Sequence, residues 1–303
     1  MIVDLDQFAD VAGACDLLRA VTYGVAAAKR EGIGELLIHH EPQRGCPESI
    51  LDLVRVEGLE LRACTPKELA SDADRIQLDC FTSFPSPANL SADLKDPAGF
   101  YRLWRESYTR LRPTREVSDA LESLNLADPC LGLHIRITDK SNRRPSEYEI
   151  HKRNVNKVLR RTRRALFAKL RQVGIRRVYL ACDSKDSMDH WSAVLEKAGI
   201  EILRNPFATF SNTSFRHTSG TDFMTDLFAF SKCIHLVAST NSGVPVTAAL
   251  ISGRPPEEII WGRYYQPLRS LESNLERLER RRQKRREAAL GGRSHCPTFA
   301  FMD

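Results

Sequence analysis

Long apolar segments are absent from this sequence. Among its 303 residues, no uninterrupted apolar run approaches the roughly 20 residues that a membrane-spanning helix needs. This absence argues against an integral membrane protein built on helices. The first residues, MIVDLDQFAD, carry acidic side chains where a secretory signal has a basic stretch followed by an apolar one. We therefore expect a cytoplasmic location.

Paired cysteines are also missing. The eight cysteines are dispersed along the chain, and no two of them form a CxxC pair. They stand at Cys15, Cys46, Cys64, Cys80, Cys130, Cys182, Cys233 and Cys296. This spacing argues against a zinc ribbon and against a small domain held together by disulfides. Reduced thiols that act as small core residues are the simplest interpretation.

Metal-binding motifs are scarce as well. The sequence has no evident DxD pair of the kind that holds a divalent metal. His39, His40 and Glu41 form a cluster on paper, but neighbouring residues of a strand point to opposite faces. We therefore expect no metal site.

The composition that remains is that of a globular protein. Hydrophobic residues make up 42% of the chain and charged residues 28%, a balance that argues against disorder. At roughly 100–200 residues per domain, the length predicts two domains. The formal net charge is +6, and its location is more informative than its size.

The positive charge is concentrated near the C-terminus. Residues 263–293 contain ten basic and four acidic residues, an excess equal to that of the whole chain. Leu268, Leu271, Leu275 and Leu278 recur at helical spacing and predict an amphipathic helix. Two interpretations stay open: a docked helix with a solvated basic end, or a patch that attracts anionic lipid or another polyanion. Because no aromatic stacking pattern accompanies the charge, no nucleic-acid partner is expected.

Strands and helices alternate along the chain, which predicts parallel sheets covered by helices. The expected strands are 1–4, 35–39, 58–62, 131–137, 177–182, 201–203 and 233–238. The expected helices are 15–30, 97–112, 116–126, 147–173, 188–198, 222–232 and 242–251. The pattern restarts after Asp128-Pro129, so we predict two α/β domains, 1–125 and 126–262, followed by the basic helix and tail at 263–303.

Polar side chains gather at three strand ends of the second predicted domain. They are His134, Arg136, Thr138, Asp139 and Lys140 after one strand, Asp183 and Ser184 after the next, and Ser239, Thr240, Asn241 and Ser242 before a helix. Ligands of open α/β sheets bind beyond the carboxyl ends of the strands, and a helix N-terminus favours an anion. Each cluster alone is compatible with ordinary helix capping. Together they predict a pocket for a nucleotide or a sugar phosphate.

The same stretches resemble a known family in sequence. LGLHIRITDK (131–140) resembles the HxRxTDK motif of the GT-B fucosyltransferases, the clan that holds the core α1,6-fucosyltransferases of N-glycans and of nodulation factors. LRPTREVSDAL (111–121), VYLACDS (178–184) and TDLFAFSKCIHLVASTNSG (225–243) resemble further family segments in the same order. The resemblance implies a GT-B-like fold, in which two Rossmann-like domains face each other across a cleft, with the acceptor held by the first domain.

The activity implied by this resemblance is inverting, metal-independent transfer of fucose from GDP-fucose to a hydroxyl of a glycan, glycolipid or peptide. The donor is a substrate, and no further cofactor is implied. By position, Arg136 is expected to pair with the diphosphate, and Asp183 to lie near the guanine or ribose. Asp139 and Lys140 match the loop that meets sugar and acceptor. The other candidates for the donor site are His134, Ser184, Arg216, Asp226, Ser239, Asn241 and Ser242.

Two positions depart from the family pattern. Ile137 stands where the family has a second arginine, and Arg144 where core fucosyltransferases carry a glutamate proposed as the base. Asp139 or Glu147 is then a candidate base, whereas His134 is more typical of a structural residue. The departures leave two alternatives open: another GDP-sugar transferase of the clan, or a non-catalytic binder of nucleotide or polyanion with a degenerate site.

Overall fold

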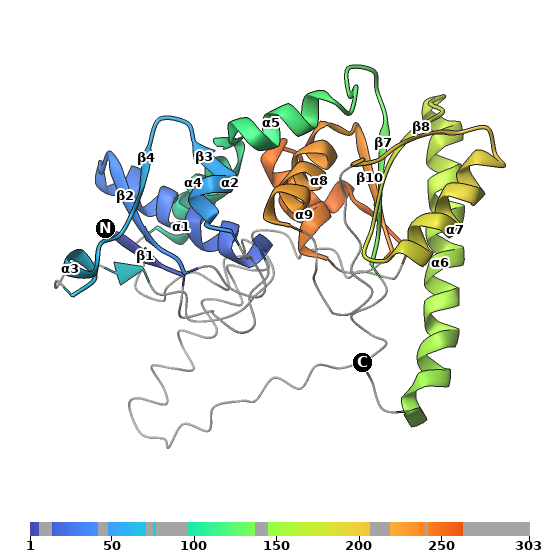
Figure 1. The fold of residues 1–303 in the computed structure, drawn as a ribbon, viewed down its shortest axis with the longest axis horizontal. Coiled ribbons are helices and arrows are strands. Elements are labelled where there is room, and N and C mark those ends of the chain that lie inside the picture. The colour runs from blue at the N-terminus through green and yellow to red at the C-terminus, as the bar shows by residue number, and fades with distance from the viewer. Residues whose placement is uncertain are drawn as a thin grey trace.

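The computed structural model describes residues 1–5, 14–41, 48–70, 75–76, 96–136, 145–206, 219–239 and 242–262 (Figure 1). Two parallel sheets with helices on their faces make up this part of the chain, as the alternation of elements predicts. None of the described helices has both the length and the apolar character needed to cross a membrane. The predicted leucine stripe and basic tail at 263–303 lie outside the described residues.

The first sheet lies in the N-terminal half and is parallel throughout. Its strand order is β4 (Glu60–Ala63), β2 (Glu35–His39), β1 (Ile2–Asp4) and β5 (Arg75–Ile76). The helices of this half are α1 (Ala14–Glu31), α2 (Ile50–Leu53), α3 (Pro66–Leu69) and α4 (Pro97–Thr109). A separate antiparallel pair joins β3 (Val54–Val56) to β6 (Leu111–Pro113).

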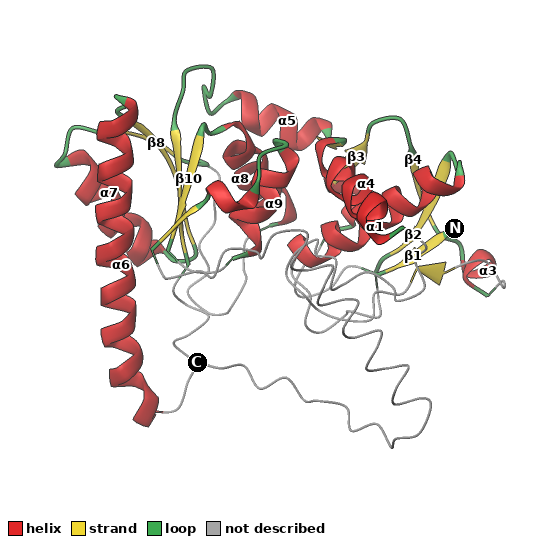
Figure 2. Cartoon of the chain, turned by 180° about the vertical axis from the view of Figure 1, so that it is seen from behind, coloured by secondary structure: helices red, strands yellow, loops and turns green. Residues whose placement is uncertain are grey.

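The second sheet is also parallel throughout. Its strand order is β11 (Ile260–Trp261), β10 (His235–Ala238), β7 (Leu131–Ile135), β8 (Arg177–Cys182) and β9 (Glu201–Leu203). The helices are α5 (Arg115–Glu122), α6 (Pro145–Val173), α7 (Lys185–Glu196), α8 (Gly220–Lys232) and α9 (Gly243–Ile251), with a 3₁₀ turn at Pro256–Glu258. Figure 2 shows α6 and α7 on the outer face of this sheet, and α8 and α9 between the two sheets.

Alternation along β7 explains how this sheet serves two layers of helices. Leu131, Leu133 and Ile135 are fully buried in a core shared with α6 and α7. Gly132 and His134 face the other way, toward α8. A Cβ atom on Gly132 would lie 2.6 Å from the ring of Phe230, so α8 packs here closely enough to require a residue without a side chain.

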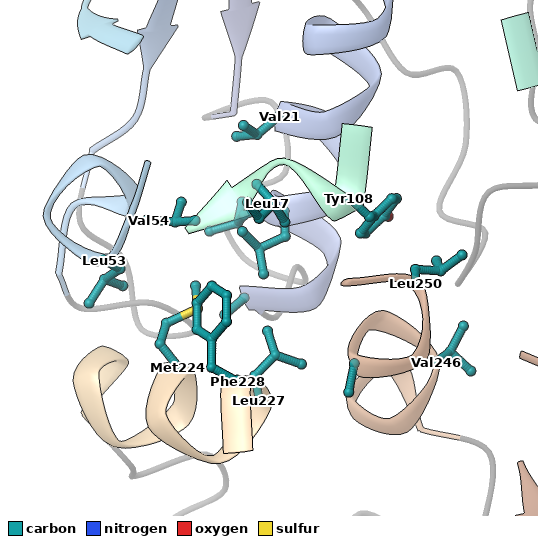
Figure 3. Packing of buried hydrophobic residues seen from close by; sticks show 14 of the residues in the cluster. Leu17, Val21, Leu53, Val54, Tyr108, Met224, Leu227, Phe228, Val246 and Leu250 are labelled. Carbon is teal, nitrogen blue, oxygen red and sulfur yellow. The ribbon is translucent and has the colours of Figure 1, made fainter. Parts of the chain in front are cut away.

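The helices between the sheets share one apolar core. Figure 3 shows Leu17 of α1 and Tyr108 of α4 on one side, with Phe228 of α8 and Val246 of α9 on the other. All four side chains are at least 96% buried and belong to the same cluster. The two halves are therefore joined by hydrocarbon packing between the sheets, and the domain boundary at residues 125–126 stays a prediction.

The structure corrects several predicted boundaries. The helix expected to continue to Arg112 ends at Thr109, and Leu111–Pro113 is instead the strand β6. Proline disfavours the helical conformation of the residue before it, and Arg112 pairs with Arg55 of β3. β7 ends at Ile135, two residues earlier than expected, which places Arg136 just after the strand.

Candidate functional site

The candidate site lies where the second sheet changes direction. From β7 the chain continues to β8 and β9 on one side, and then returns to β10 and β11 on the other side of β7. The point of divergence therefore lies between β7 and β10. In open α/β sheets, the crevice beyond the carboxyl ends of the strands at such a point is the usual place for a ligand. Arg136 follows β7 there, and Ser239 follows β10.

Ser239 holds the backbone of Arg136 in place. Its Oγ accepts a hydrogen bond from the Arg136 N–H at 2.9 Å and donates one to the Arg136 carbonyl at 3.3 Å. The Ser239 N–H donates to the carbonyl of His134 at 3.0 Å, which continues the β7–β10 pairing. Because Ser239 is 1% exposed, these bonds are shielded from water. These bonds fix the backbone of Arg136, and with it the position from which its side chain extends.

The N-terminus of α9 lies beside this pair. Ser242 caps the helix, with its Oγ accepting from the N–H of Val244 at 3.4 Å. The first N–H groups of a helix have no partner within the helix, and they favour a negatively charged neighbour. Ser239 and Ser242 were both predicted as site residues, and the structure brings them to the same end of the sheet as Arg136.

The first half of the chain reaches the same place through α1. A Cβ atom on Gly243 would lie 2.9 Å from the Cβ of Cys15, so the first turns of α1 and α9 are in contact. Burial raises the pKa of the Cys15 thiol to about 12, and the positive charge of Arg136 acts in the opposite direction. Sequence reasoning missed this contribution of α1. The signal that could have indicated it is that the expected strand at 1–4 is followed by the expected helix at 15–30, as the strand at 233–238 is followed by the helix at 242–251.

His134 is held as a neutral imidazole. It is 8% exposed, and burial together with the charge of Arg136 lowers its pKa to about 3. Its ring stands edge-on to Phe230, with the centroids 5.8 Å apart. Within the described part of the chain, its Nδ1 has no hydrogen-bond partner. This environment suits a packing residue and not a general base that works near neutral pH.

Asp183 and Ser184 continue from β8. The N–H of Asp183 donates to the carbonyl of Ile135 at 3.0 Å, so Asp183 lies next to the end of β7. Ser184 is the N-cap of α7: its Oγ accepts from the N–H of Ser187 at 3.3 Å and donates to the Ser187 hydroxyl at 2.8 Å. The hydroxyl of Ser184 is thus used within the protein, which favours the capping interpretation for this residue.

The carboxyl group of Asp226 has a pKa well above the usual value for an aspartate. It is partly buried on α8, and the hydroxyl of Tyr179 on β8 donates a hydrogen bond to it. Burial raises the pKa of Asp226 to about 7, the Tyr179 bond acts against this, and the charge of Asp222 adds to the rise. The charges of Asp183 and Asp226 both help to raise the pKa of Cys182. Asp226 therefore lies close to the end of β8.

Several predicted site residues fall outside the part of the chain that the structure describes. Asp139, Lys140, Arg216 and Asn241 lie outside the described residues, and so does the side chain of Glu147. Among the described residues, no three His, Cys, Asp or Glu side chains gather in a way that could hold a metal ion. His39 pairs with Asp4 at 3.0 Å, and His40 Nδ1 accepts from the N–H of Ile50 at 3.1 Å, so both rings have structural partners.

Comparison with known proteins gives structural similarity without sequence matches. No protein-family model and no curated protein sequence matches this chain. The fold is similar to that of the crystal structure of NodZ α-1,6-fucosyltransferase soaked with GDP-fucose. The two chains are 12% identical, the match covers 84% of this chain and 92% of that chain, and the TM-score is 0.49. NodZ from Bradyrhizobium gives 12% identity, coverage of 84% and 93%, and a TM-score of 0.47. Arabidopsis thaliana FUT1 in complex with GDP gives 12% identity, coverage of 84% and 69%, and a TM-score of 0.49.

Proposed function

We propose that this chain is an inverting, metal-independent glycosyltransferase that moves fucose from GDP-fucose to a hydroxyl group of a glycan, glycolipid or peptide. One observation carries the proposal: Arg136 stands at the divergence point of the second sheet, fixed by Ser239 and next to the N-terminus of α9. The identity of the sugar follows from the resemblance of the motifs at 131–140 and 225–243.

The arrangement suits a diphosphate. A guanidinium group presents parallel N–H donors that match two phosphate oxygens, and the first N–H groups of α9 add a second set of donors. When the bond between the sugar and GDP breaks, negative charge develops on the leaving diphosphate. Donors already fixed in position stabilise this charge without having to reorganise. In this proposal, Arg136 supplies the positive charge that a divalent metal supplies in other transferases.

The acceptor hydroxyl must lose a proton, and a carboxylate within hydrogen-bond reach is expected to take it. His134, with its low pKa, is unsuited to this role. Asp226 is engaged by a hydrogen bond from Tyr179, and the motif resemblance places it among the residues that line the donor site, so we keep it in that role. Asp139 and Glu147 remain the two candidates for the base.

Calorimetric titration with GDP tests the donor site. The wild-type chain is expected to bind GDP, and Arg136→Ala is expected to weaken binding by at least about tenfold, the loss that follows from one charge-assisted bidentate contact. Arg55→Ala, an exposed arginine on β3, is the matched control and should bind GDP as the wild type does. Equal affinity of the Arg136 variant and the wild type would overturn the proposal.

Turnover separates the enzyme from its rival. The chain should hydrolyse GDP-fucose faster than it hydrolyses GDP-mannose. The departures at Ile137 and Arg144 favour one second candidate, a non-catalytic nucleotide binder. Arg136-dependent GDP binding without hydrolysis of either donor, and without transfer to any acceptor, would support that candidate.

A further inference from the structure

Helix α6 carries an unusual density of positive charge. Between Ile150 and Val173 the sequence has nine lysines and arginines and no aspartate or glutamate. Leu166 and Leu170 bury one side of the helix against the second sheet. The remaining surface is left to the cations, several of which are exposed, namely Lys157, Arg160, Arg161, Arg163, Arg164 and Arg171.

These cations are not neutralised within the described part of the protein. Arg160 donates only to the carbonyl of Asn156, at 3.4 Å, and the guanidinium of Arg163 lies 5.8 Å from the ring centre of Phe167. Neither pairs with a carboxylate of a described residue, in contrast to Arg62, which contacts Glu35 and Glu68 in the other half. Like charges one turn apart on a helix repel each other. An anionic partner would remove that repulsion.

An apolar hollow accompanies the charge. A space of about 500 Å³ lies between α6 and α7, with Phe167, Ala193 and Val194 among its walls and Arg163 and Lys197 at its rim. A second hollow of about 530 Å³, which shares Arg163 and Val194, extends it toward Arg160. From Arg160 to Arg171 the helix rises by roughly 16 Å. The face therefore combines hydrocarbon walls with a line of guanidinium groups.

We propose that this α6–α7 face binds an anionic phospholipid surface. Its cations meet the phosphate groups, and its apolar hollow takes hydrocarbon from the interface. Arginine suits this position because its apolar stem can lie along hydrocarbon while its head stays with the phosphates. A sulfated or acidic polysaccharide would use the charge but leave the apolar walls without a partner. The proposal does not depend on the enzymatic activity.

The position of the face agrees with such a contact. α6 and α7 cover the side of the second sheet opposite to α8 and α9, at the outer end of the molecule (Figures 1 and 2). A membrane on this side would not cover the contact between Cys15 and Gly243, where the candidate donor site lies.

Sedimentation with lipid vesicles tests the proposal on the full chain. The wild type is expected to bind vesicles of equal parts phosphatidylglycerol and phosphatidylcholine, and not vesicles of phosphatidylcholine alone. The triple variant Arg160→Gln, Arg163→Gln, Arg164→Gln should bind the anionic vesicles about 100-fold more weakly, from the contribution of each basic residue near such a surface. A control with Arg55→Gln, Lys67→Gln and Arg115→Gln loses the same charge from exposed positions outside α6 and α7 and should bind almost as the wild type does.

A second variant tests the hollow. Ala193 is exposed on α7, so Ala193→Glu should fold normally while placing a carboxylate beside Arg163, and it should weaken vesicle binding at least tenfold. Ala70→Glu, also exposed, is its control. If the triple variant binds anionic vesicles as tightly as the wild type, basic residues elsewhere make the contact. If the charge control loses as much vesicle binding as the triple variant, the binding depends on net charge and not on this face. Binding of heparin that depends on Arg160, Arg163 and Arg164, without binding of vesicles, would replace the lipid by a soluble polyanion. Each of these three results overturns the proposal.

Discussion

The carboxyl group of Asp226 shows how the folded environment can shift the pKa of a single residue. Half-buried against β8, it receives a hydrogen bond from Tyr179, yet burial keeps its pKa near 7 instead of the usual 3.8. The identity of such a residue is visible in a sequence motif, but its titration is not. Likewise, Ser239 is recognisable as a polar residue at a strand end. Its two bonds to Arg136, 103 positions away in the chain, exist only after the sheet has formed.

The raised pKa of Asp226 predicts that stability falls as pH rises. Between about pH 4 and pH 7 the folded state retains a proton that the unfolded chain has lost, so the free energy of unfolding decreases over this range and levels off above it. Asp226→Asn keeps an acceptor for the Tyr179 hydroxyl and should remove most of this loss, roughly 2–4 kcal/mol. Urea unfolding at a series of pH values measures it. Asp189→Asn, an exposed aspartate on α7, should leave the slope unchanged, and an unaltered slope in Asp226→Asn would contradict the assignment.

At the scale of elements, the long helices and core strands are predictable because their periodicity is strong. β2, β8, α1 and α6 lie within two residues of their expected ends. β3 and β6 have three residues each, too few to show a period. Their pairing links Val54 to Pro113, and this distant contact decides their structure. The candidate site follows the same rule: the cap at Ser242 is a local signal, whereas the approach of Cys15 to Gly243 depends on how the halves pack.

Beyond its N-cap Ser219, helix α8 has a carboxylate from the other half at its N-terminus, and this contact yields a prediction. Both carboxylate oxygens of Glu48 accept from the N–H of Gly220, each at 2.7 Å. A negative charge at a helix N-terminus is favourable, and Glu48→Gln should cost about 1–2 kcal/mol of stability in chemical denaturation. Glu57→Gln removes an exposed pairing with Arg112 and should cost less than about 1 kcal/mol. Equal costs for the two variants would show that Glu48 does not stabilise α8.

At the scale of the whole molecule, the apolar layer between the sheets joins the two halves through one shared core. Leu17 and Val21 from the first half and Met224 and Leu227 from the second are all at most 1% exposed within one cluster (Figure 3). The sequence predicted two domains from its length and the restart of its pattern. It contained no sign that the helices of both would share their buried sides, because any amphipathic helix presents the same stripe whatever covers it.

This shared core predicts a single unfolding transition. Trp104 reports on the first half and Trp191 on the second, and both are buried. In a Trp191→Phe, Trp261→Phe variant that keeps only Trp104 and a Trp104→Phe, Trp261→Phe variant that keeps only Trp191, the fluorescence midpoints should coincide. Leu227→Ala in either background should lower the free energy of unfolding by about 2–5 kcal/mol. Two separate midpoints, or a shift in only one half, would show that the halves unfold independently.

The shared core also limits how far the two halves can move relative to each other. Two domains that separate repeatedly need contact surfaces that tolerate water. The surfaces in contact here are apolar, and they include Phe228 and Val246. Pulling them apart would cost roughly 25 cal/mol for every square ångström of hydrocarbon wetted. A large rotation of one half against the other would therefore be an energetically costly way to admit a ligand. We expect the two sheets to keep the same spacing whether or not a ligand is bound.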